Sequence, residues 1–524
     1  MGASLDNLPV ELYLAIISHF HLDDRQQSLL SLSRAIPRSP VPTHILFERI
    51  RLRHPVQIFR LYTRLRRTPD DASRVRSFSL ESWTVDADVF VNLMALLPTM
   101  ERLSMYVGPN FAPEHMEEIF HAPRVGLQFI SMRFRPYVQR ATYYQFLKGA
   151  YFDSTLLSLS RWPPQTLPTL SVVQDPLDPS LAPSNFAQPL VFFRLDPLAT
   201  LAVSPLCYDL KHFRLRVPSR QVCRHLYALP KSYPNLEFLD MSTSNISPRD
   251  LEGLLGRVSS LRVLVLDGCP IVSQRTDVQA DAGEPFLQWM ELGQTLALAG
   301  VRRATEREKK LKAWLEDYYA NAQDEDSAQS AGSSKKPRKG RKGLATATFS
   351  LRAPSPERKG REDVTIPRGR IPPRGQKVRV LPSPPALCSL ATSFPRELTP
   401  ETYEAVKTEF ERGWAAGIAR LASIRLRLQT SYRNGVACVV RFADKGTPEW
   451  EEEGTHGEQG LAGLVDVREE GAFVLNIVAD GEAGTSARQG HACPLLCLTG
   501  PGRGSEHVDG CGHQMGWDVF GDEV

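Results

Sequence analysis

The sequence lacks long apolar runs, a secretory leader and a regular cysteine framework. No stretch reaches the roughly 18 apolar residues that a membrane-spanning helix needs, so we expect no membrane segment. A lipid anchor is also not expected, because Asp6 stands where the myristoylation motif has serine or threonine. The eight cysteines have no disulfide-type spacing, and no signal peptide precedes them. We therefore expect reduced thiols and a cytoplasmic or nuclear location.

Sequence signatures of catalysis are also lacking. No nucleophile elbow, zinc-protease helix or protein-kinase motif occurs. The segment 500–504 is glycine-rich, but no strand precedes it and no Lys-Ser pair follows, so it does not match a phosphate-binding loop. We predict that the chain is not an enzyme and that it uses no cofactor.

A handful of cysteines and histidines near the C-terminus are potential zinc ligands. They are His491, Cys493, Cys497, Cys511 and His513. Their spacing matches no standard zinc finger or ribbon, and the glycine-rich surroundings suggest no supporting core. We predict no metal site from this pattern.

Charge is small overall but unevenly distributed. A net charge of +4 on 524 residues gives no reason to expect nucleic-acid binding by the whole chain. From residue 323 to about 395 the composition is rich in Ser, Pro, Gly, Lys and Arg, which predicts a disordered basic linker. Its densest part, residues 335–342, is typical of nuclear import signals or of phosphate attraction, and equally of a solvated linker.

The first twenty residues carry a strong helical pattern. Pro9 suits a first helical turn, and Asp6 or Asn7 would cap it. Apolar residues recur every four positions along one face: Leu8, Leu12, Ile16 and Phe20. Two further short helices are expected at 25–34 and 43–50, giving a helical module over residues 1–54. Such a module buries little of its own apolar surface, so we expect it to have a partner.

A repeat follows this module. The string Leu261-x-x-Leu264-x-Leu266-x-x-Cys269-x-Ile271 matches the leucine-rich-repeat consensus. The same apolar triplet recurs at steps of 25 to 27 residues, or a double step across a Pro-rich insertion at 161–205, beginning at Val75, Met100, Leu127, Ser154, Leu210 and Leu236. An irregular strand is expected at 190–195. The pattern predicts an α/β fold, with an arc of parallel strands and helices over residues 55–300.

Residues between the triplets alternate to the other face of each strand. They include arginines and aromatics, which favour protein binding. The candidate substrate-binding residues are Arg102, Tyr106, Phe129, Arg133, Arg214 and Phe238. Arginines suggest an acidic or phosphorylated target, although an ordinary solvated strand face explains them equally well.

The second half contains two expected helices. A charged helix at 301–322 would close the end of the arc. A second helical segment lies within 396–440, where Thr399 is a cap and Pro400 takes the first position. Residues 441–524 are first acidic and then glycine-rich, so we expect a tail with little fixed structure.

Taken together, the run Leu8-Pro9-x-Glu11-Leu12 and the repeat behind it resemble F-box proteins with leucine-rich repeats. The family's Val-Ser-Arg-x-Trp stretch appears here as residues 32–36 without a tryptophan. The resemblance implies a substrate-recognition subunit of an SCF-type ubiquitin ligase that docks on a Skp-type adaptor and the cullin core. It implies adaptor contacts by Leu8, Pro9, Leu12, Ile16 and Phe20, an unknown protein substrate on the arc, and catalysis by partners.

Two other interpretations remain open. In the first, the protein is a repeat scaffold without a ubiquitin role, and the N-terminal helices only cap it. In the second, which we favour less, it is a nuclear protein associated with nucleic acid through the basic linker.

Overall fold

The structure is a computed structural model of the chain. It describes residues 8–20, 22–108, 110–135, 151–164, 166–176, 195–273, 286–330, 371–394, 397–456, 459–475, 492–500 and 507–521. The chain divides into two compact units, and each is made from separate parts of the sequence. The first unit comprises Met1–Arg303, Ser383–Ala422 and Leu475–Val524, and the second comprises Ala304–Pro382 and Ser423–Val474.

The N-terminal residues form three short helices, as expected. These are α1 (Val10–Ser18), α2 (Leu22–Ala35) and the 3-10 helix η2 (Thr43–Phe47). Tyr13, Ile17 and Leu29 form a small core of their own, separate from the core of the sheet that follows. Pro9 occupies the N-cap position with an extended backbone, one place earlier than the first turn.

A ten-stranded sheet forms the body of the first unit. Its strands are all parallel and follow the chain order from β1 to β8, after which β10 and β13 are added. The predicted α/β class is therefore confirmed. The strands are β1 (Arg49–Leu52), β2 (Ser77–Leu80), β3 (Arg102–Val107), β4 (Phe129–Phe134), β5 (Thr169–Gln174), β6 (His212–Arg216), β7 (Phe238–Asp240), β8 (Val263–Val265), β10 (Ser389–Ser393) and β13 (Leu495–Thr499).

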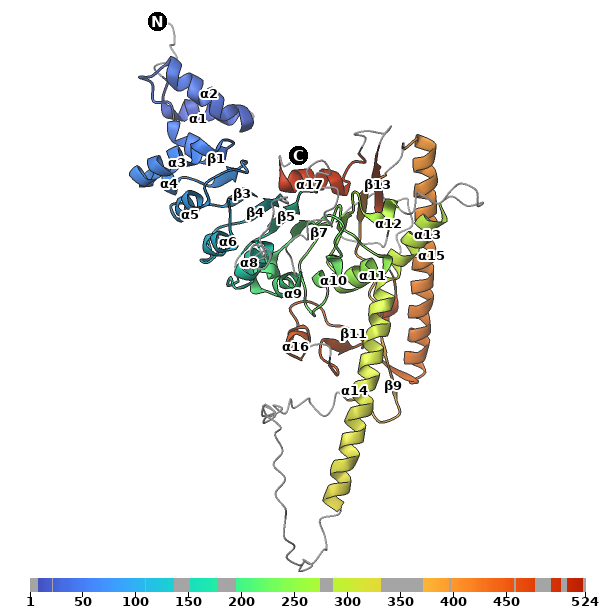
Figure 1. The fold of residues 1–524 in the computed structure, drawn as a ribbon. Helices are drawn as coiled ribbons and strands as arrows, with labels where there is room; N and C mark the ends of the chain where they lie inside the picture. Colours follow the sequence, from blue (N-terminus) through green and yellow to red (C-terminus); the bar gives the residue numbers. More distant parts are fainter. Residues whose placement is uncertain are drawn as a thin grey trace, which may run out of the picture. The chain divides into compact units, whose positions relative to one another are not determined.

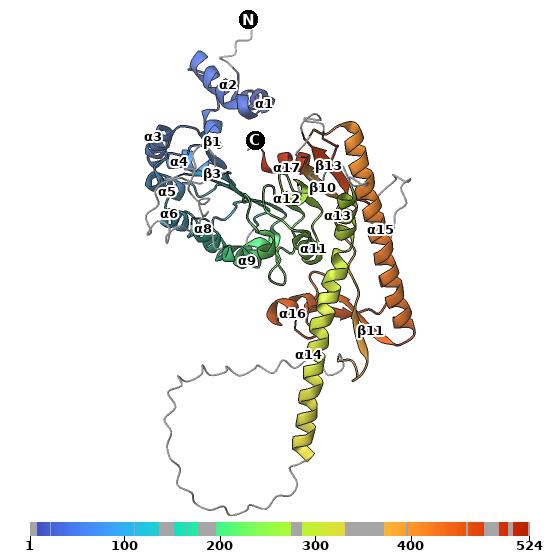
Figure 2. The same ribbon diagram turned by 45° about the vertical axis from the view of Figure 1, so that its right-hand side comes forward.

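Helices that follow the strands lie along one face of this sheet (Figure 1). They are α3 (Pro55–Arg67), α4 (Pro69–Ser73), α5 (Ala87–Ala95), α6 (Pro113–Ile119), α8 (Tyr151–Ser160), α9 (Asp196–Ala202), η3 (Pro205–Asp209), α10 (Cys223–Leu226), α11 (Pro248–Arg257), α12 (Pro270–Ser273) and α13 (Leu287–Ala297). The C-terminal helix α17 (Gly512–Phe520) lies at the opposite face (Figure 2).

The register of the sheet explains the apolar repeat in the sequence. Leu103 pairs with Ile130, and Leu239 pairs with Leu264, so the predicted triplet positions line up across neighbouring strands. These side chains are fully buried in one core beneath the helices. Burial of this row, at about 25 cal/mol per Å² of apolar surface, is the main force that holds the strand–helix units together.

One predicted strand was wrong. Residues 154–159 belong to α8, because Phe152, Leu156 and Leu159 are spaced by four and three residues and are all buried on one side of a helix. The strand of this unit is β5, which lies inside the predicted insertion at 161–205. Of the irregular strand expected at 190–195, residues 190–194 lie outside the described residues, and Leu195 is the N-cap of α9.

Two strands of the large sheet come from segments in which we expected little structure, as do β9 (Lys377–Val380) and β12 (Leu464–Asp466) of the second unit. β10 lies at the end of the predicted linker and pairs with β8. β13 lies in the predicted low-order tail and pairs with β10. Between them, α15 (Pro400–Arg433) begins where predicted, with the Thr402 N–H donating to the Thr399 hydroxyl at 3.2 Å, and it ends within the predicted segment 396–440. The basic cluster 335–342 lies outside the described residues.

The second unit contains most of the long helix α14 (Ala299–Ser330) and a small sheet. The sheet is formed by β12 (Leu464–Asp466), β11 (Ala437–Phe442) and β9 (Lys377–Val380). The same unit also contains α16 (Pro448–His456) and the 3-10 helix η5 (Glu470–Phe473). Buried arginines bind backbone carbonyls here: Arg307 donates to the carbonyls of Gly460 at 3.0 Å and Ala462 at 2.6 Å. None of the helices in the described part of the chain is long and apolar enough to cross a membrane.

Candidate functional site

Helix α1 has a buried flank and an exposed apolar flank. Tyr13 and Ile17 are nearly inaccessible, with 1% and 2% of their surfaces exposed. Leu12 and Ile16 are 48% and 43% exposed, and Phe20, just beyond the helix, is 39% exposed. We call Leu12, Ile16 and Phe20 the apolar stripe. Because the core of the module is already formed by the other flank, the stripe is free to meet a partner.

The remaining predicted adaptor-binding residues divide between these two environments. Pro9 is exposed at the start of α1, beside the stripe. Leu8 is half-buried and packs against the small core of the module. The sequence periodicity placed Leu8 and the stripe on one face, but Leu8 precedes the helix, so its direction does not follow the helical period.

The sheet face opposite the helices carries an arginine–aromatic patch near its N-terminal end. The rings of Trp83 and Tyr106 stack with centroids 4.7 Å apart. The guanidinium carbon of Arg133 lies 5.6 Å from the centre of the Tyr106 ring, and that of Arg135 lies 5.6 Å from the Trp83 ring. Arg133 also donates to Asp175 at 2.6 Å. We define the patch as Trp83, Tyr106, Arg133 and Arg135.

Sequence reasoning found only half of this patch. Tyr106 and Arg133 were predicted because they occupy alternate positions in strands. Trp83 and Arg135 were missed because each follows the end of its strand, where the period-two pattern no longer applies. An aromatic or arginine within three residues after a predicted strand is the signal that would have found them.

Farther along the same face, the chain covers itself. The ring of Phe520 in α17 lies 5.7 Å from that of Phe238 and 6.5 Å from that of Phe129. The guanidinium carbon of Arg214 lies 3.9 Å from the centre of the Phe520 ring. Three of the predicted substrate-binding residues, Phe129, Arg214 and Phe238, are therefore buried under α17 rather than exposed. The expectation that the tail lacks fixed structure caused this difference.

A buried charge network holds the arginines of this covered region. Asp240 is 2% exposed and accepts hydrogen bonds from Arg216 at 2.7 and 3.0 Å, and Arg214 lies 3.2 Å from the same carboxylate. Ser242 donates from its backbone and hydroxyl at 3.0 and 2.6 Å. Burial raises the pKa of Asp240, but the two arginines and Ser242 outweigh it and lower the pKa below its usual value. Arg214 and Arg216 therefore pair with a buried carboxylate of the chain itself.

Arg102, the last predicted residue, lies between the two regions. Its side chain is exposed, and its guanidinium carbon lies 4.0 Å from the centre of the Phe129 ring. It therefore borders the covered region instead of joining the patch.

Four potential metal ligands meet at the C-terminal end of this face. They are Cys497 on β13, His507, Cys511 at the N-cap of α17, and His513 in its first turn, and their ligand atoms all lie within 4.8 Å of one another. Burial raises the pKa of the Cys497 thiol, but contacts with His513, Cys511 and the Val508 backbone outweigh burial and lower the pKa.

The sequence had identified part of this cluster with a different set of ligands. Cys497, Cys511 and His513 come together although their spacing led us to predict no metal site, whereas Cys493 is not a member and His491 lies outside the described residues. His507 was missed although it stands only four residues before Cys511, a short spacing that would have identified it.

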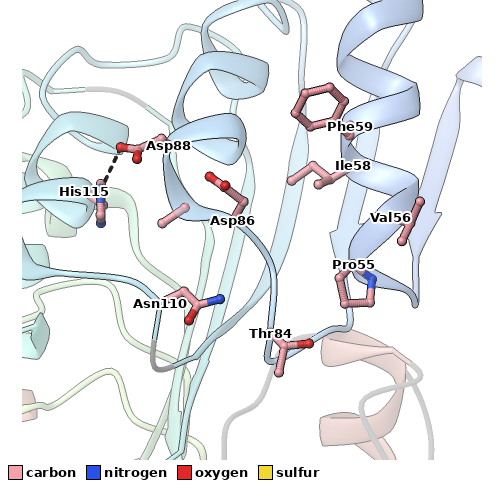
Figure 3. A pocket seen from close by; sticks show the side chains of 10 residues that line it. Pro55, Val56, Ile58, Phe59, Thr84, Asp86, Asp88, Asn110 and His115 are labelled. Carbon is pink, nitrogen blue, oxygen red and sulfur yellow. Dashed lines mark hydrogen bonds and ion pairs between the residues drawn. The ribbon is translucent and has the colours of Figure 1, made fainter.

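A pocket of about 580 Å³ lies beside α3 and α5 (Figure 3). Most of its polar side chains have structural partners: Asp86 caps α5 by accepting from the Val89 N–H at 3.1 Å, and Asp88 lies 3.1 Å from His115. Asn110 donates to a backbone carbonyl at 3.0 Å. The pocket thus offers an apolar wall at Phe59 and no nucleophile paired with a base.

No protein-family model matches the sequence, and no curated protein is significantly similar to it. The features of this chain that can bind a partner or a metal are the apolar stripe, the arginine–aromatic patch and the Cys–His cluster.

Proposed function

We propose that this protein is a substrate-recognition subunit of an SCF-type ubiquitin ligase. In this proposal, the N-terminal helices form an F-box-like module that docks on a Skp-type adaptor, and the parallel sheet with its helices is an irregular leucine-rich-repeat solenoid that holds a target protein. The observation that carries the proposal is the apolar stripe, Leu12, Ile16 and Phe20, exposed on a module that has its own core.

Energetics support a docking role for the stripe. Full burial of a Leu, Ile or Phe side chain contributes about 1.5–3 kcal/mol relative to leaving it in water. Because these three side chains are only 39–48% exposed, together they offer about 2–4 kcal/mol to a partner with a matching groove. An amphipathic helix that lays its apolar face into a groove is a common mode of protein recognition.

The arrangement of the sheet supports the repeat assignment. Each strand pairs in parallel with the next strand along the chain from β1 to β8, and a helix generally follows each strand. Stacking of such units on their nearest neighbours is the organisation of leucine-rich-repeat proteins. In this arrangement the N-terminal module binds the adaptor, and the array of strands and helices binds the target.

The arginine–aromatic patch is the proposed target-binding surface. Trp, Tyr and Arg are the side chains most enriched among residues that dominate binding energy at protein interfaces. Arginine forks also bind carboxylates and phosphates through two parallel hydrogen bonds. We therefore propose that the target presents an acidic or phosphorylated segment to Arg133 and Arg135.

The mechanism needs no reaction chemistry from this chain. A target held on the patch is brought near a ubiquitin-conjugating enzyme that the cullin core carries. Tethering makes the encounter effectively intramolecular and raises the effective concentration of the target lysines. The chain contributes binding and orientation, while its partners supply the catalysis.

Co-purification tests this proposal. The full chain should retain a Skp-type adaptor and a cullin, and Leu12→Asp or Ile16→Asp should abolish this retention because each buries a charge in an apolar interface. Leu14→Asp is the matched control, since Leu14 is 39% exposed on the same helix but lies off the stripe. Failure of the wild-type chain to retain the adaptor would instead favour a repeat scaffold with no ubiquitin role.

A further inference from the structure

The Cys–His cluster brings four potential metal ligands within the span of a single metal site. The Nδ1 atom of His507 lies 3.9 Å from the sulfur of Cys497 and 3.8 Å from that of Cys511. Zinc–ligand bonds of about 2.3 Å to sulfur and about 2.0–2.1 Å to nitrogen place tetrahedral ligands roughly 3.3–3.8 Å apart. The four ligand atoms, within 4.8 Å of one another, need only small shifts to close around an ion.

An unsatisfied buried nitrogen points independently to a ligand. The Nδ1 atom of His513 is buried without a hydrogen-bond partner, and only 8% of the residue is exposed. Leaving such an atom unpaired costs about 1–3 kcal/mol. The other ring nitrogen, Nε2, lies 2.9 Å from the Asp267 carboxylate. Metal-binding histidines usually donate their second ring N–H to a carboxylate in this way, which directs the free lone pair at the metal.

We propose that Cys497, His507, Cys511 and His513 together bind one Zn²⁺ ion, with Asp267 orienting His513. Two thiolates and two neutral imidazoles balance the charge of a divalent ion. Sulfur ligands disfavour Ca²⁺ and Mg²⁺, which prefer oxygen, and a tetrahedral set of two sulfurs and two nitrogens suits zinc. The site has four protein ligands and no open position, so its role is structural.

The ion would fasten the C-terminal helix to the sheet. Helix α17 has nine residues, and a helix this short is not stable alone in water. Its start packs directly on the sheet: a Cβ atom added to Gly512 would lie 2.9 Å from Val263 and 3.1 Å from Ala391. Zinc would join this start to β13, with the ring of Trp517 packed 4.4 Å from that of His507. Metal binding thereby keeps Phe520 over Phe238.

Metal analysis of the purified full-length chain tests the proposal. We expect about one zinc per chain, and we expect Co²⁺ substitution to give the absorption bands of tetrahedral cobalt with thiolate ligands. His507→Gln combined with Cys511→Ser should lose both signals. His507→Cys should keep the zinc, because three cysteines and one histidine are also a zinc set. Cys388→Ser, which changes an exposed cysteine outside the cluster, should keep it as well.

Folding is checked separately, so that loss of metal is not confused with misfolding. His507 is only half-buried, so the single variant His507→Gln should retain the far-UV circular dichroism of the wild type while losing zinc affinity at least about tenfold. Absence of zinc from the wild type after zinc-supplemented expression, or undiminished zinc in the double variant, would overturn the proposal.

Discussion

The ring of Phe520 in α17 lies 5.7 Å from the ring of Phe238 in β7. This contact divides the sheet face opposite the helices into two parts. The chain itself covers one part, including Phe129 and Arg214, and the other part carries the stacked pair Trp83 and Tyr106. A target protein that binds this face therefore contacts its N-terminal part, where α17 does not cover the side chains.

Phe520→Ala should release α17 from the sheet. The side chain is 2% exposed, and removing a buried phenylalanine costs about 3–5 kcal/mol. We expect faster amide hydrogen exchange in residues 512–520, measured by mass spectrometry, with little change in α1. Met515→Ala is the control, because Met515 is 38% exposed on the same helix. Equal protection of α17 in both variants would show that the Phe520 contacts do not hold the helix.

Trp83→Ala, Tyr106→Ala and Arg133→Glu should each weaken target binding at least about tenfold, which corresponds to about 1.4 kcal/mol. The physical reason is loss of the stacked aromatic platform or reversal of its charge. Quantitative affinity purification with the adaptor signal as internal reference measures the effect. Tyr208→Ala, which alters a 44% exposed tyrosine outside the patch, should leave the target signal unchanged. A target signal unaffected by all three patch variants would exclude this surface.

Asp240→Asn should destabilise the first unit by about 3 kcal/mol at pH 7, because it leaves two arginines near a neutral group in a buried site. The folded-state pKa of Asp240 is lowered, so its stabilising contribution is present above the unfolded pKa of about 3.9 and is lost as pH falls through the folded value. The difference between the free energies of unfolding of the wild type and the variant, measured with denaturant, should therefore become smaller below about pH 4.

The control for this pH dependence is Asp209→Asn, which alters an exposed aspartate and should change stability by no more than about 0.5 kcal/mol. A gap between wild type and Asp240→Asn that stayed constant from pH 7 to pH 3 would contradict the assignment of an ionised, paired Asp240.

Much of the fold could be predicted from the sequence because its core is periodic. Leu103 and Leu264 occupy equivalent positions in strands β3 and β8, and the spacing between the repeated triplets revealed this equivalence. The same rule failed at 154–159, where residues spaced for a strand also satisfied the period of a helix. Short apolar strings do not distinguish these alternatives without tertiary context.

The rest depends on contacts between distant parts of the chain. β10 and β13 join the sheet by pairing with β8 and with each other, and neither follows the preceding strand at the step of 25 to 27 residues. His507 becomes a candidate ligand because β13 and α17 bring Cys497 and Cys511 to it. Such long-range placement is not encoded in local patterns.

Direct binding of a purified Skp-type adaptor to the full chain tests the central proposal most directly. We expect isothermal titration to give a one-to-one complex whose Kd rises at least about a hundredfold, or about 2.7 kcal/mol, in Leu12→Asp and Ile16→Asp but not in Leu14→Asp. Absence of binding by the wild-type chain, or equal affinity of all three variants, would contradict the proposal that the apolar stripe on α1 docks on the ligase adaptor.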